Sequence, residues 1–452
     1  MKYIIGLATV ALFSSCSIYG TFKTPEVQSA QITGSSNHLP DSALAIPGWK
    51  DIFSDPILQK LIEKGLTHNT DLQIAQLNIE QAEAVLLTSK LAYLPSFMLT
   101  PEGNISSFNR SKASFAYNLP VNAQWEIDLF GKLRNNKEKA RSVLLQSIEY
   151  KRLIETQLVS AIANSYYTLQ MLREQLAITR LFINNQKQNL EIIKVMKEAG
   201  MQTEAGVNQA TANYYNTCTS EKDLSMQIST LENNIALLIN GAPEKIATTA
   251  FSKELSLDKN LFNGISLTAL SNRPDVKNAE YKLREYFYNK NIAHAAFYPS
   301  ITLGGSAGWT NNIGGMISNP GKILLSAIGS LTQPLFNKGI NMANLKIAKI
   351  NYEQSLLSFN QSLLNAGVEV NNALIQCQNS NEKTALRTQE IEANEKALNN
   401  SLELMKHSSV TYLEVIYAEN SLLQSRLLQV SDWFAGIQGQ ISLYKALGGG
   451  AN

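Results

Sequence analysis

Residues 92–96 read Ala-Tyr-Leu-Pro-Ser, and residues 296–300 read Ala-Phe-Tyr-Pro-Ser. The pattern Asp-x-x-x-Ala precedes each stretch, at Asp71 and again at Asp275, so both features keep one spacing of 204 residues. Further matched stretches follow in the same order: Leu129–Lys132 with Leu335–Lys338, and 200–210 with 408–418. A unit of this length is too long for a solenoid repeat. The chain therefore contains two copies of one supersecondary block.

Each block contains a predicted pair of strands: about 96–106 and 116–129 in the first, about 300–311 and 323–335 in the second. From Tyr117 to Leu129 every second residue is apolar, and the residues between them are mostly polar. Such a strand has one apolar and one polar face. The pattern fits a soluble sheet with one wet face, and it equally fits a membrane barrel with its apolar face outward. Glu126 and Asp128 share the polar face, and we expect them to line a lumen and not to form a catalytic pair.

Long helices follow the strands in each block. The stretch Lys132–Ala199 contains neither Gly nor Pro, which at about 1.5 Å per residue permits a helix of roughly 100 Å. Apolar residues such as Val159 and Ile162 recur at coiled-coil spacing. We therefore expect helical hairpins at about 132–240 and about 339–447. A helical rod without a pore is the alternative, but a rod does not insert a strand pair ahead of each hairpin.

The amino terminus has the pattern of a lipoprotein signal peptide. A short charged start precedes an apolar run, Ile4–Phe13, that is too short to span a bilayer. Small residues then precede Cys16, which fits lipoprotein processing and acylation of that cysteine. We expect a signal peptide at 1–15 and a lipid-anchored extended segment at 16–52. Plain secretion with a coincidental cysteine is the alternative.

Composition and motifs argue against other classes of protein. The 39 basic residues nearly balance the 37 acidic ones, so there is no polybasic field for nucleic acid. The 4 histidines have no metal-ligand spacing, and there is no phosphate-binding glycine loop or nucleophile elbow. We expect no enzymatic activity, no metal, and no cofactor other than a covalent lipid on Cys16. Spacing leaves open whether Cys218 and Cys377 pair.

The number of strands predicts an oligomer. Nothing after residue 15 is apolar for long enough to form a transmembrane helix, so a membrane-spanning form would have to be a barrel. Four strands cannot close one, because small single-chain barrels have at least eight. A cyclic trimer would supply twelve. The predicted fold class is therefore mainly α with a small membrane β-barrel portion, in which a trimeric 12-stranded barrel is continued by an α-helical tunnel.

Three further motifs have the order and spacing of one family. Residues 272–276 read Asn-Arg-Pro-Asp-Val, ahead of the stretch at 296–300. Residues 125–134 read Trp-Glu-Ile-Asp-Leu-Phe-Gly-Lys-Leu-Arg, and residues 443–450 read Leu-Tyr-Lys-Ala-Leu-Gly-Gly-Gly. In these motifs, which cover the chain from about residue 45 to 450, it resembles the TolC-like outer-membrane efflux proteins and within them the NodT-type lipoproteins.

The resemblance implies a homotrimer in the outer membrane, with a first structural repeat at 53–241, an equatorial connector at 242–264 and a second repeat at 265–450. The expected function is the exit channel of a tripartite efflux pump, which passively conducts what an inner-membrane resistance-nodulation-division transporter and a periplasmic adaptor (membrane fusion) protein deliver. Type I protein secretion with an ATP-binding cassette exporter and a periplasmic scaffold without a pore are the alternatives. The substrate is not readable from the sequence.

The resemblance also assigns the tips at which the adaptor docks. They are Gly200 and Met201 in the first hairpin, and Ser408 and Ser409 in the second. The family usually carries a glycine at both turns, and Ser408 replaces the second. Because glycine adopts positive φ at little cost, Ser408 predicts an altered turn.

The periplasmic gate is assigned in the same way. Leu413 occupies the position of a leucine ring, and Tyr417 occupies the position at which related channels carry an aspartate ring. An aromatic ring would close the pore by bulk and not by charge, with Glu414 as the nearest acidic residue. Packing of Leu413 and Tyr417 as ordinary helix-seam residues is the alternative.

Overall fold

The computed structural model describes residues 19–25, 48–107, 109, 112–251, 270–313, 316–406 and 412–449. The chain divides into two units. Unit 1 comprises Met1–Val27, Leu77–Glu149 and Lys277–Gln361, and unit 2 comprises Gln28–Gln76, Tyr150–Val276 and Ser362–Asn452. Each unit takes segments from both sequence repeats, so the units are not the two repeats themselves.

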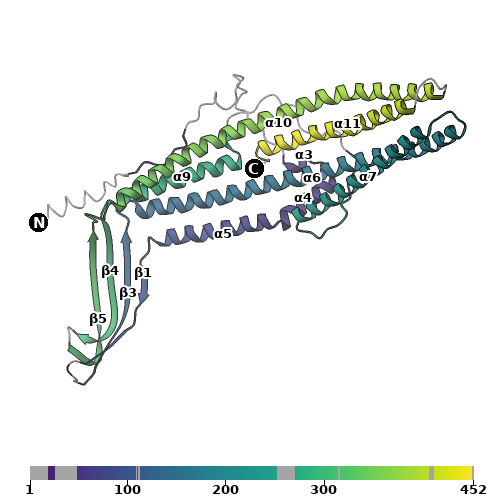
Figure 1. The fold of residues 1–452 in the computed structure, drawn as a ribbon. Coiled ribbons are helices and arrows are strands. Elements are labelled where there is room, and N and C mark those ends of the chain that lie inside the picture. Colours follow the sequence, from purple (N-terminus) through teal and green to yellow (C-terminus); the bar gives the residue numbers. More distant parts are fainter. Residues whose placement is uncertain are drawn as a thin grey trace. The chain divides into compact units, whose positions relative to one another are not determined.

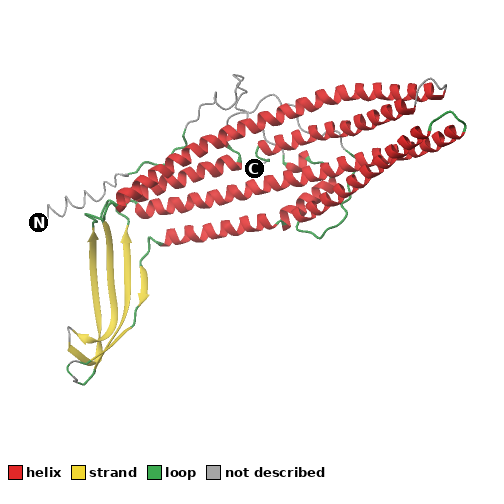
Figure 2. Cartoon of the chain, viewed as in Figure 1, coloured by secondary structure: helices red, strands yellow, loops and turns green. Residues whose placement is uncertain are grey.

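Helices make up most of the described residues (Figures 1 and 2). Their bounds are α3 Trp49–Ile52, α4 Pro56–His68, α5 Thr70–Leu91, α6 Lys132–Glu198, α7 Glu204–Leu238, α9 Pro274–Ala295, α10 Ile340–Lys406 and α11 Tyr412–Ala446. Both α6 and α10 have 67 residues. A glycine with positive φ precedes each of them, Gly131 at 73° and Gly339 at 78°, a conformation that costs glycine little.

These two glycines correct the predicted alignment of the repeats. The sequence match pairs Gly131 with Asn337. In the structure Gly131 corresponds to Gly339, because each is the residue directly before its long helix. The structural alignment of the loop that leads into α10 therefore differs by two residues from the alignment of the matching sequence. The similar residues of the two repeats do not occupy the same backbone positions there.

Unit 1 contains one five-stranded antiparallel sheet in the order β1-β3-β4-β5, with β2 also paired to β3. The strands are β1 Ser96–Leu99, β2 Glu102–Ser106, β3 Ser114–Ile127, β4 Ser300–Ile313 and β5 Met316–Thr332. The first predicted strand is thus two strands that keep one register on β3, with Ser96 opposite Gln124 and Glu102 opposite Asn118. Pro101 lies in the break and has no N–H to donate to a neighbour.

The register places apolar side chains of neighbouring strands on one face. Trp125 lies opposite Leu303, and Val121 lies opposite Ala307. The alternate residues of β3 and β4 are small or polar, whereas β5 carries Leu324 and Ile328 at such positions. Ser306 of β4 bonds its hydroxyl to that of Ser326 of β5 at 2.6 Å. Trp125 and Leu303 each remain 41% exposed. The chain by itself therefore leaves the apolar face of the sheet uncovered.

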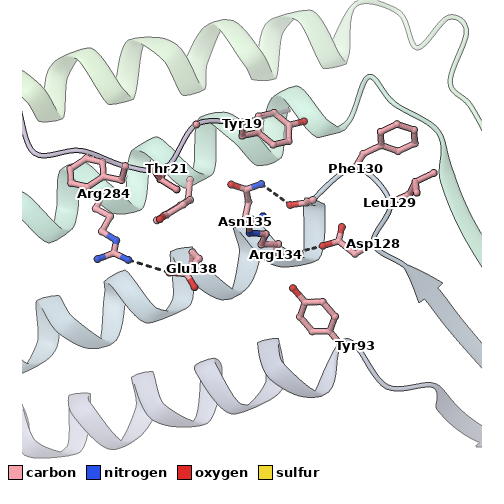
Figure 3. Close-up of a pocket in the computed structure, with 14 residues that line it drawn as sticks. Tyr19, Thr21, Tyr93, Asp128, Leu129, Phe130, Arg134, Asn135, Glu138 and Arg284 are labelled. Atoms are coloured by element: carbon pink, nitrogen blue, oxygen red, sulfur yellow. Dashed lines mark hydrogen bonds and ion pairs between the residues drawn. The ribbon is translucent and has the colours of Figure 1, made fainter. Parts of the chain in front are cut away.

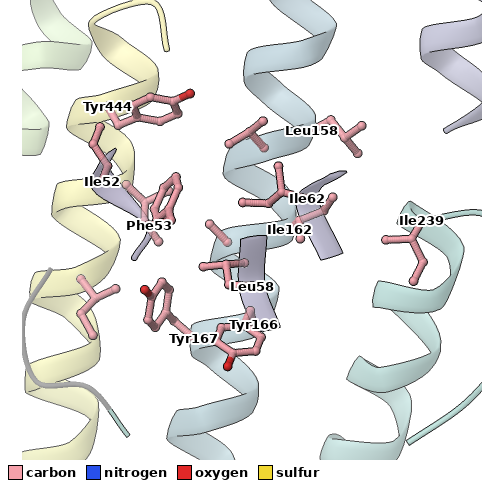
Figure 4. Close-up of a cluster of buried hydrophobic side chains, with 14 of the residues drawn as sticks. Ile52, Phe53, Leu58, Ile62, Leu158, Ile162, Tyr166, Tyr167, Ile239 and Tyr444 are labelled. Atoms are coloured by element: carbon pink, nitrogen blue, oxygen red, sulfur yellow. The ribbon is translucent and has the colours of Figure 1, made fainter. Parts of the chain in front are cut away.

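Unit 2 contains a core formed by α3, α4, α6 and α11 (Figure 4). Leu58 of α4 and Ile162 and Tyr166 of α6 are fully buried, at 0% exposed. The rings of Phe53 and Tyr444 meet edge to face at 5.5 Å. This packing joins α3 and α4, near the start of the described chain, to α6 and to α11, the last helix of the second repeat.

Asp55 fixes the start of α4 against this core. Its carboxylate accepts from the backbone N–H of Ile57 at 2.8 Å and from the hydroxyl of Tyr166 at 2.7 Å. Burial by itself raises the pKa of Asp55, but these bonds and one from Thr249 outweigh it, so the pKa lies below its ordinary value. Asp55 therefore caps a helix and ties it to α6 in its charged form.

We expect Ile162→Ala to lower the free energy of unfolding by about 2–5 kcal/mol, because it removes a fully buried side chain and leaves a cavity. Chemical denaturation of the purified protein measures the change. Val195→Ala on the same helix is the control, since Val195 is 64% exposed and its truncation should cost less than about 0.5 kcal/mol. Equal losses in the two variants would contradict the assignment of this core.

Candidate functional site

The turn between α6 and α7 forms the predicted tip of the first hairpin. Gly200 has a φ of 73°, and Met201 N donates to Met196 O at 2.8 Å, the pattern that ends many helices at a left-handed glycine. Thr203 then caps α7 by accepting from Gly206 N at 3.2 Å. These contacts fix the turn, and they leave the side chain of Met201 51% exposed. The second predicted tip, Ser408 and Ser409, lies outside the described residues, as does Cys16.

The predicted gate residues lie on one exposed stripe at the start of α11. Leu413 is 63% exposed, Tyr417 is 76% exposed, and Glu414 is exposed beside them. Their neighbours Val415 and Ile416 are buried. Leu413 and Tyr417 are one helical turn apart and so share a face. Neither belongs to the buried core of a single chain, and their role as a gate stays a prediction.

The opposite face of α11 packs into a cluster that joins four helices of unit 2. The cluster contains Leu190 and Ile193 of α6, Val207 and Ala210 of α7, Met405 of α10, and Tyr412, Val415 and Ile416 of α11. It holds the predicted gate helix against its neighbours close to the first tip. Asn420 adds a polar link, since its Nδ2 donates to Asn213 Oδ1 of α7 at 3.0 Å.

A buried carboxyl, which the sequence did not predict, interrupts this apolar face. Glu419 is 4% exposed, and its Oε1 accepts a hydrogen bond from Asn189 Nδ2 of α6. Within the described residues, its Oε2 and both polar amide atoms of buried Gln186 have no hydrogen-bond partner. The available signal was the position of Glu419 four residues after Val415, on the buried stripe of α11.

Burial sets the protonation of this carboxyl. It raises the pKa of Glu419 to about 7, against a smaller opposite effect of the bond from Asn189. Burial and the charge of Glu419 also raise the pKa of Tyr412. Unsatisfied buried polar groups weaken packing. The contact between α6 and α11 is therefore weaker here than in the apolar cluster one to two turns away.

The two predicted lumen carboxylates have local partners in unit 1. Glu126 pairs with Lys132 Nζ at 2.9 Å. Asp128 accepts from Leu133 N at 3.0 Å and from Arg134 N at 2.7 Å, so it caps α6 (Figure 3). They therefore position the strand-to-helix junction, which explains their place in the sequence motif. Their role in a lumen stays a prediction.

A cavity of about 560 Å³ lies beside this junction (Figure 3). Its wall includes Tyr19 and Thr21, Tyr93 just after α5, Arg134 of α6 and Arg284 of α9. Tyr19 meets His294 edge to face at 5.7 Å and covers Gly131, where an added Cβ would lie 3.6 Å from its ring. The segment that follows Cys16 in the sequence is thus docked on the junction.

The Asn-Arg-Pro-Asp motif is a structural brace in unit 2. Arg273 is 5% exposed and donates to Ala446 O at 2.8 Å, to Glu369 Oε2 at 2.6 Å and to Asp275 Oδ2 at 2.7 Å. It therefore ties the start of α9 to α10 and to the end of α11. A charged group this deeply buried is stable only when it is paired in this way.

The remaining predictions concern the cysteines, metal binding and membrane-spanning helices. Cys218 and Cys377 are both free thiols. The described part of the chain contains no cluster of three or more metal-ligating side chains. None of its described helices is apolar over a sufficient length to cross a membrane.

Comparison with known proteins gives a consistent set of similarities. The family described as "Outer membrane efflux protein" matches residues 61–241 and 266–449. The chain is 30% identical over 446 residues to the cation efflux system protein CusC of Escherichia coli K12, covering 97% of both chains. It is 27% identical to the probable outer membrane lipoprotein SilC of Salmonella typhimurium, covering 99% of this chain and 98% of SilC. The solved open state of the Neisseria gonorrhoeae MtrE outer membrane channel matches with a TM-score of 0.83 and 26% identity, over 96% of this chain and 98% of MtrE.

We expect Glu419→Gln to stabilise the protein by an amount that grows as the pH rises from about 4.5 to about 7. Well below pH 4.5 the carboxyl is neutral in the folded and unfolded states, so the two proteins should be equally stable. Above about pH 7 the wild type must keep a buried charge, so the variant should be more stable by about 3 kcal/mol. Denaturation midpoints at pH 3.5, 6 and 8.5 measure the difference. Exposed Glu392→Gln is the control, and a stabilisation by Glu419→Gln that does not vary with pH would contradict the placement of this carboxyl.

Proposed function

The chain belongs to the outer membrane efflux protein family and is an outer-membrane exit channel for efflux, and we propose that it works as a homotrimer whose strands close one barrel. The observation that carries the proposal is the incomplete sheet of unit 1. Among the described strands, β5 pairs only with β4, and β1 and β2 pair only with β3. Both edges are open, and the apolar face between them is uncovered. Open edges that face lipid leave backbone groups unsatisfied, so closure requires further copies of the chain.

The internal duplication predicts how the edges join. The first strand of each repeat begins at Ser96 and at Ser300, and the second strand of each leads to Gly131 and to Gly339. Within the chain, the second strand of repeat one pairs with the first strand of repeat two, with Val121 opposite Ala307. The same pairing, shifted by one repeat along the chain, joins the second strand of repeat two in one protomer to the first strand of repeat one in the next. It places Gly329 and Ala327 of one protomer opposite Gly103 and Ile105 of the next.

The pattern of faces supports this register. Leu325 lies opposite Ala307 in β4–β5, and Gly103 lies opposite Tyr117 in β2–β3, so odd-numbered residues share a face of the sheet up to the register shift that follows Thr310 of β4. The predicted pairs also join odd numbers with odd numbers. Leu331 at 68%, Ile105 at 66% and Phe97 at 71% exposed would then continue one apolar outer face around the ring. A register shifted by one residue would turn this face inward.

The helices supply the rest of the duct. In a ring of three chains, the exposed stripe of Leu413 and Tyr417 faces the axis and closes the tunnel by bulk. The cluster behind it keeps α11 packed on α6 and α7, and the buried Glu419 makes that packing less stable. Opening then requires α11 to move relative to α6 and α7, and the weaker packing at Glu419 lowers the free energy that this movement costs.

The remaining components of the efflux system follow from the family resemblance. A periplasmic adaptor docks at the tips that carry Gly200, Met201, Ser408 and Ser409, and an inner-membrane resistance-nodulation-division transporter provides the energy. Cys16 carries the lipid, and the relative SilC is named a probable outer membrane lipoprotein. CusC is named a cation efflux protein. The names of the relatives favour small-solute efflux over protein secretion.

Cysteines at the predicted pair should join neighbouring protomers. In a Cys218→Ser background, Gly329→Cys with Gly103→Cys should give disulfide-linked dimers and trimers on mild oxidation, read on non-reducing gels. Both sites have room for a Cβ, since nothing lies closer than 3.7 Å to one at Gly329 and nothing within 4 Å of one at Gly103.

The matched control combines Gly329→Cys with Ile105→Cys. These positions are diagonal in the predicted register, with Cα atoms about 7–8 Å apart, which is too far for an unstrained bridge. Cross-linking in the control but not in the first pair would overturn the register. No cross-link in either pair, for a protein that migrates as a monomer, would overturn the trimer.

Tyr417→Ala should open the channel. Removing an exposed aromatic ring from the narrowest point should give larger and more frequent single-channel openings in planar bilayers, by several-fold in open probability. Leu413→Ala should act in the same direction. Tyr215→Ala on α7 is the control, because Tyr215 is also exposed, at 63%. Wild-type conductance in both gate variants would place the constriction elsewhere.

A further inference from the structure

Basic residues concentrate on the helix ends next to the sheet in unit 1. The first ten residues of α6 contain Lys132, Arg134, Lys137, Lys139 and Arg141, with Glu138 as the acidic residue among them. The corresponding stretch of the second repeat, 338–349, contains Lys338, Lys346 and Lys349 and no acidic residue. The end of α9 that leads into β4 adds Lys282, Arg284 and Lys290 against Glu285.

The charge reverses farther along the same helices. Beyond the sheet-proximal ends, the unit 1 parts of α5, α6, α9 and α10 carry one basic residue, Lys277. They carry five acidic residues: Glu80, Glu83, Glu149, Glu280 and Glu353. The basic residues therefore form a band that follows the border between helices and sheet. We call Arg134, Arg141, Lys346 and Lys349, which are all exposed, the basic collar.

This band opposes local helix electrostatics. The amino-terminal end of a helix carries partial positive charge and favours acidic residues. Neither α6 nor α10 has an acidic residue in its first turn, and α6 has Lys132 and Arg134 there instead. The basic first turn of α6 departs from this local rule and indicates a function for those charges.

The basic groups also crowd one another. Arg284 is paired with Glu138 at 3.1 Å, and Lys132 is paired with Glu126. Lys290 lies over the ring of Tyr352 at 4.3 Å, and burial together with the charge of Lys349 lowers its pKa. Among the described residues, no carboxylate forms an ion pair with any of the four collar residues. An anion from outside the chain would relieve this repulsion.

Apolar side chains accompany the collar. Leu335 and Phe336 are 94% and 86% exposed, and Met342 and Ile347 are 71% and 56% exposed. The uncovered apolar face of the sheet begins directly beyond them. Lysine and arginine interleaved with exposed apolar groups are typical of surfaces that lie at the boundary between lipid chains and headgroups.

We propose that the basic collar binds the phosphate groups of anionic phospholipids in the membrane leaflet next to the helices. The proposal rests on the proposed function, since it requires the sheet to lie in a membrane. The lipid would fix the depth of the sheet in the membrane.

The test measures which lipid contacts the purified protein in vesicles. Trp125 is the reporter, because it lies at the sheet end of the junction, where its Nε1 donates to Tyr93 O at 2.8 Å. Brominated phosphatidylglycerol and brominated phosphatidylcholine each quench tryptophan fluorescence on contact. We expect the anionic lipid to be preferred by roughly fivefold or more at low salt. The preference should be nearly lost at 1 M salt, where charges are screened beyond about 3 Å.

The variant Arg134→Glu, Arg141→Glu, Lys346→Glu, Lys349→Glu should lose the preference at low salt as well. Acidic residues near the starts of α6 and α10 suit the helix dipole, so folding should be preserved. The matched control reverses four exposed lysines of unit 2: Lys60→Glu, Lys187→Glu, Lys383→Glu, Lys396→Glu. It makes the same change in net charge and should keep the preference.

Conductance of the same vesicles separates the two proposals. A conducting wild type without lipid preference would overturn the collar alone, as would a collar variant that keeps the preference or a control that loses it. A wild type that forms no trimer and does not conduct would instead overturn the proposed function, and the collar with it.

Discussion

The structure depends on a sheet that one chain cannot complete. Strands β3 and β4 have partners on both sides, whereas the described outer strands β1, β2 and β5 have one each. Backbone groups without partners are costly away from water. The same sheet presents Trp125, Leu303 and their neighbours as one uncovered apolar face. Both features are satisfied together when identical chains close the sheet in lipid, and neither is satisfied by a single chain in water.

Duplication makes such closure geometrically simple. Because the second strand of one repeat already pairs with the first strand of the other, a contact between chains can repeat a contact that exists within the chain. The helices follow the same logic, since α6 and α10 have equal length and start from equivalent glycines. Close helix contact needs small residues as well. A Cβ added at Gly439 of α11 would lie 2.7 Å from Cys377 Sγ of α10.

Stability is distributed unevenly along the helices of unit 2. The core around Tyr166 and Ile162 is fully buried, and Arg273 braces three helices with paired hydrogen bonds. Near the first tip the packing of α11 includes Glu419, a carboxyl with one buried oxygen that lacks a partner within the described residues. Segments that move are drawn from the less stable parts of a protein. The predicted gate stripe lies on the same helix as this weak contact, which is where a channel needs its freedom to move.

The sequence by itself determined the duplication, the helix lengths, the alternating strands and the family. These features depend on local periodicity and on matching segments, and both are visible in a linear chain. Gly200 could also be assigned to a turn in this way, because positive φ selects glycine locally.

Only the tertiary structure decided which residues meet. It aligned Gly131 with Gly339 and not with Asn337, and it split the first strand at Pro101. It also assigned Asp128 to the cap of α6 and buried Glu419 beside Asn189. The sequence could not supply these results, because register, capping and burial are set by partners that lie elsewhere in the chain. Glu419 and Asn189 are 230 residues apart. The pKa of a carboxyl is raised only when a helix from elsewhere in the chain packs over it and excludes water.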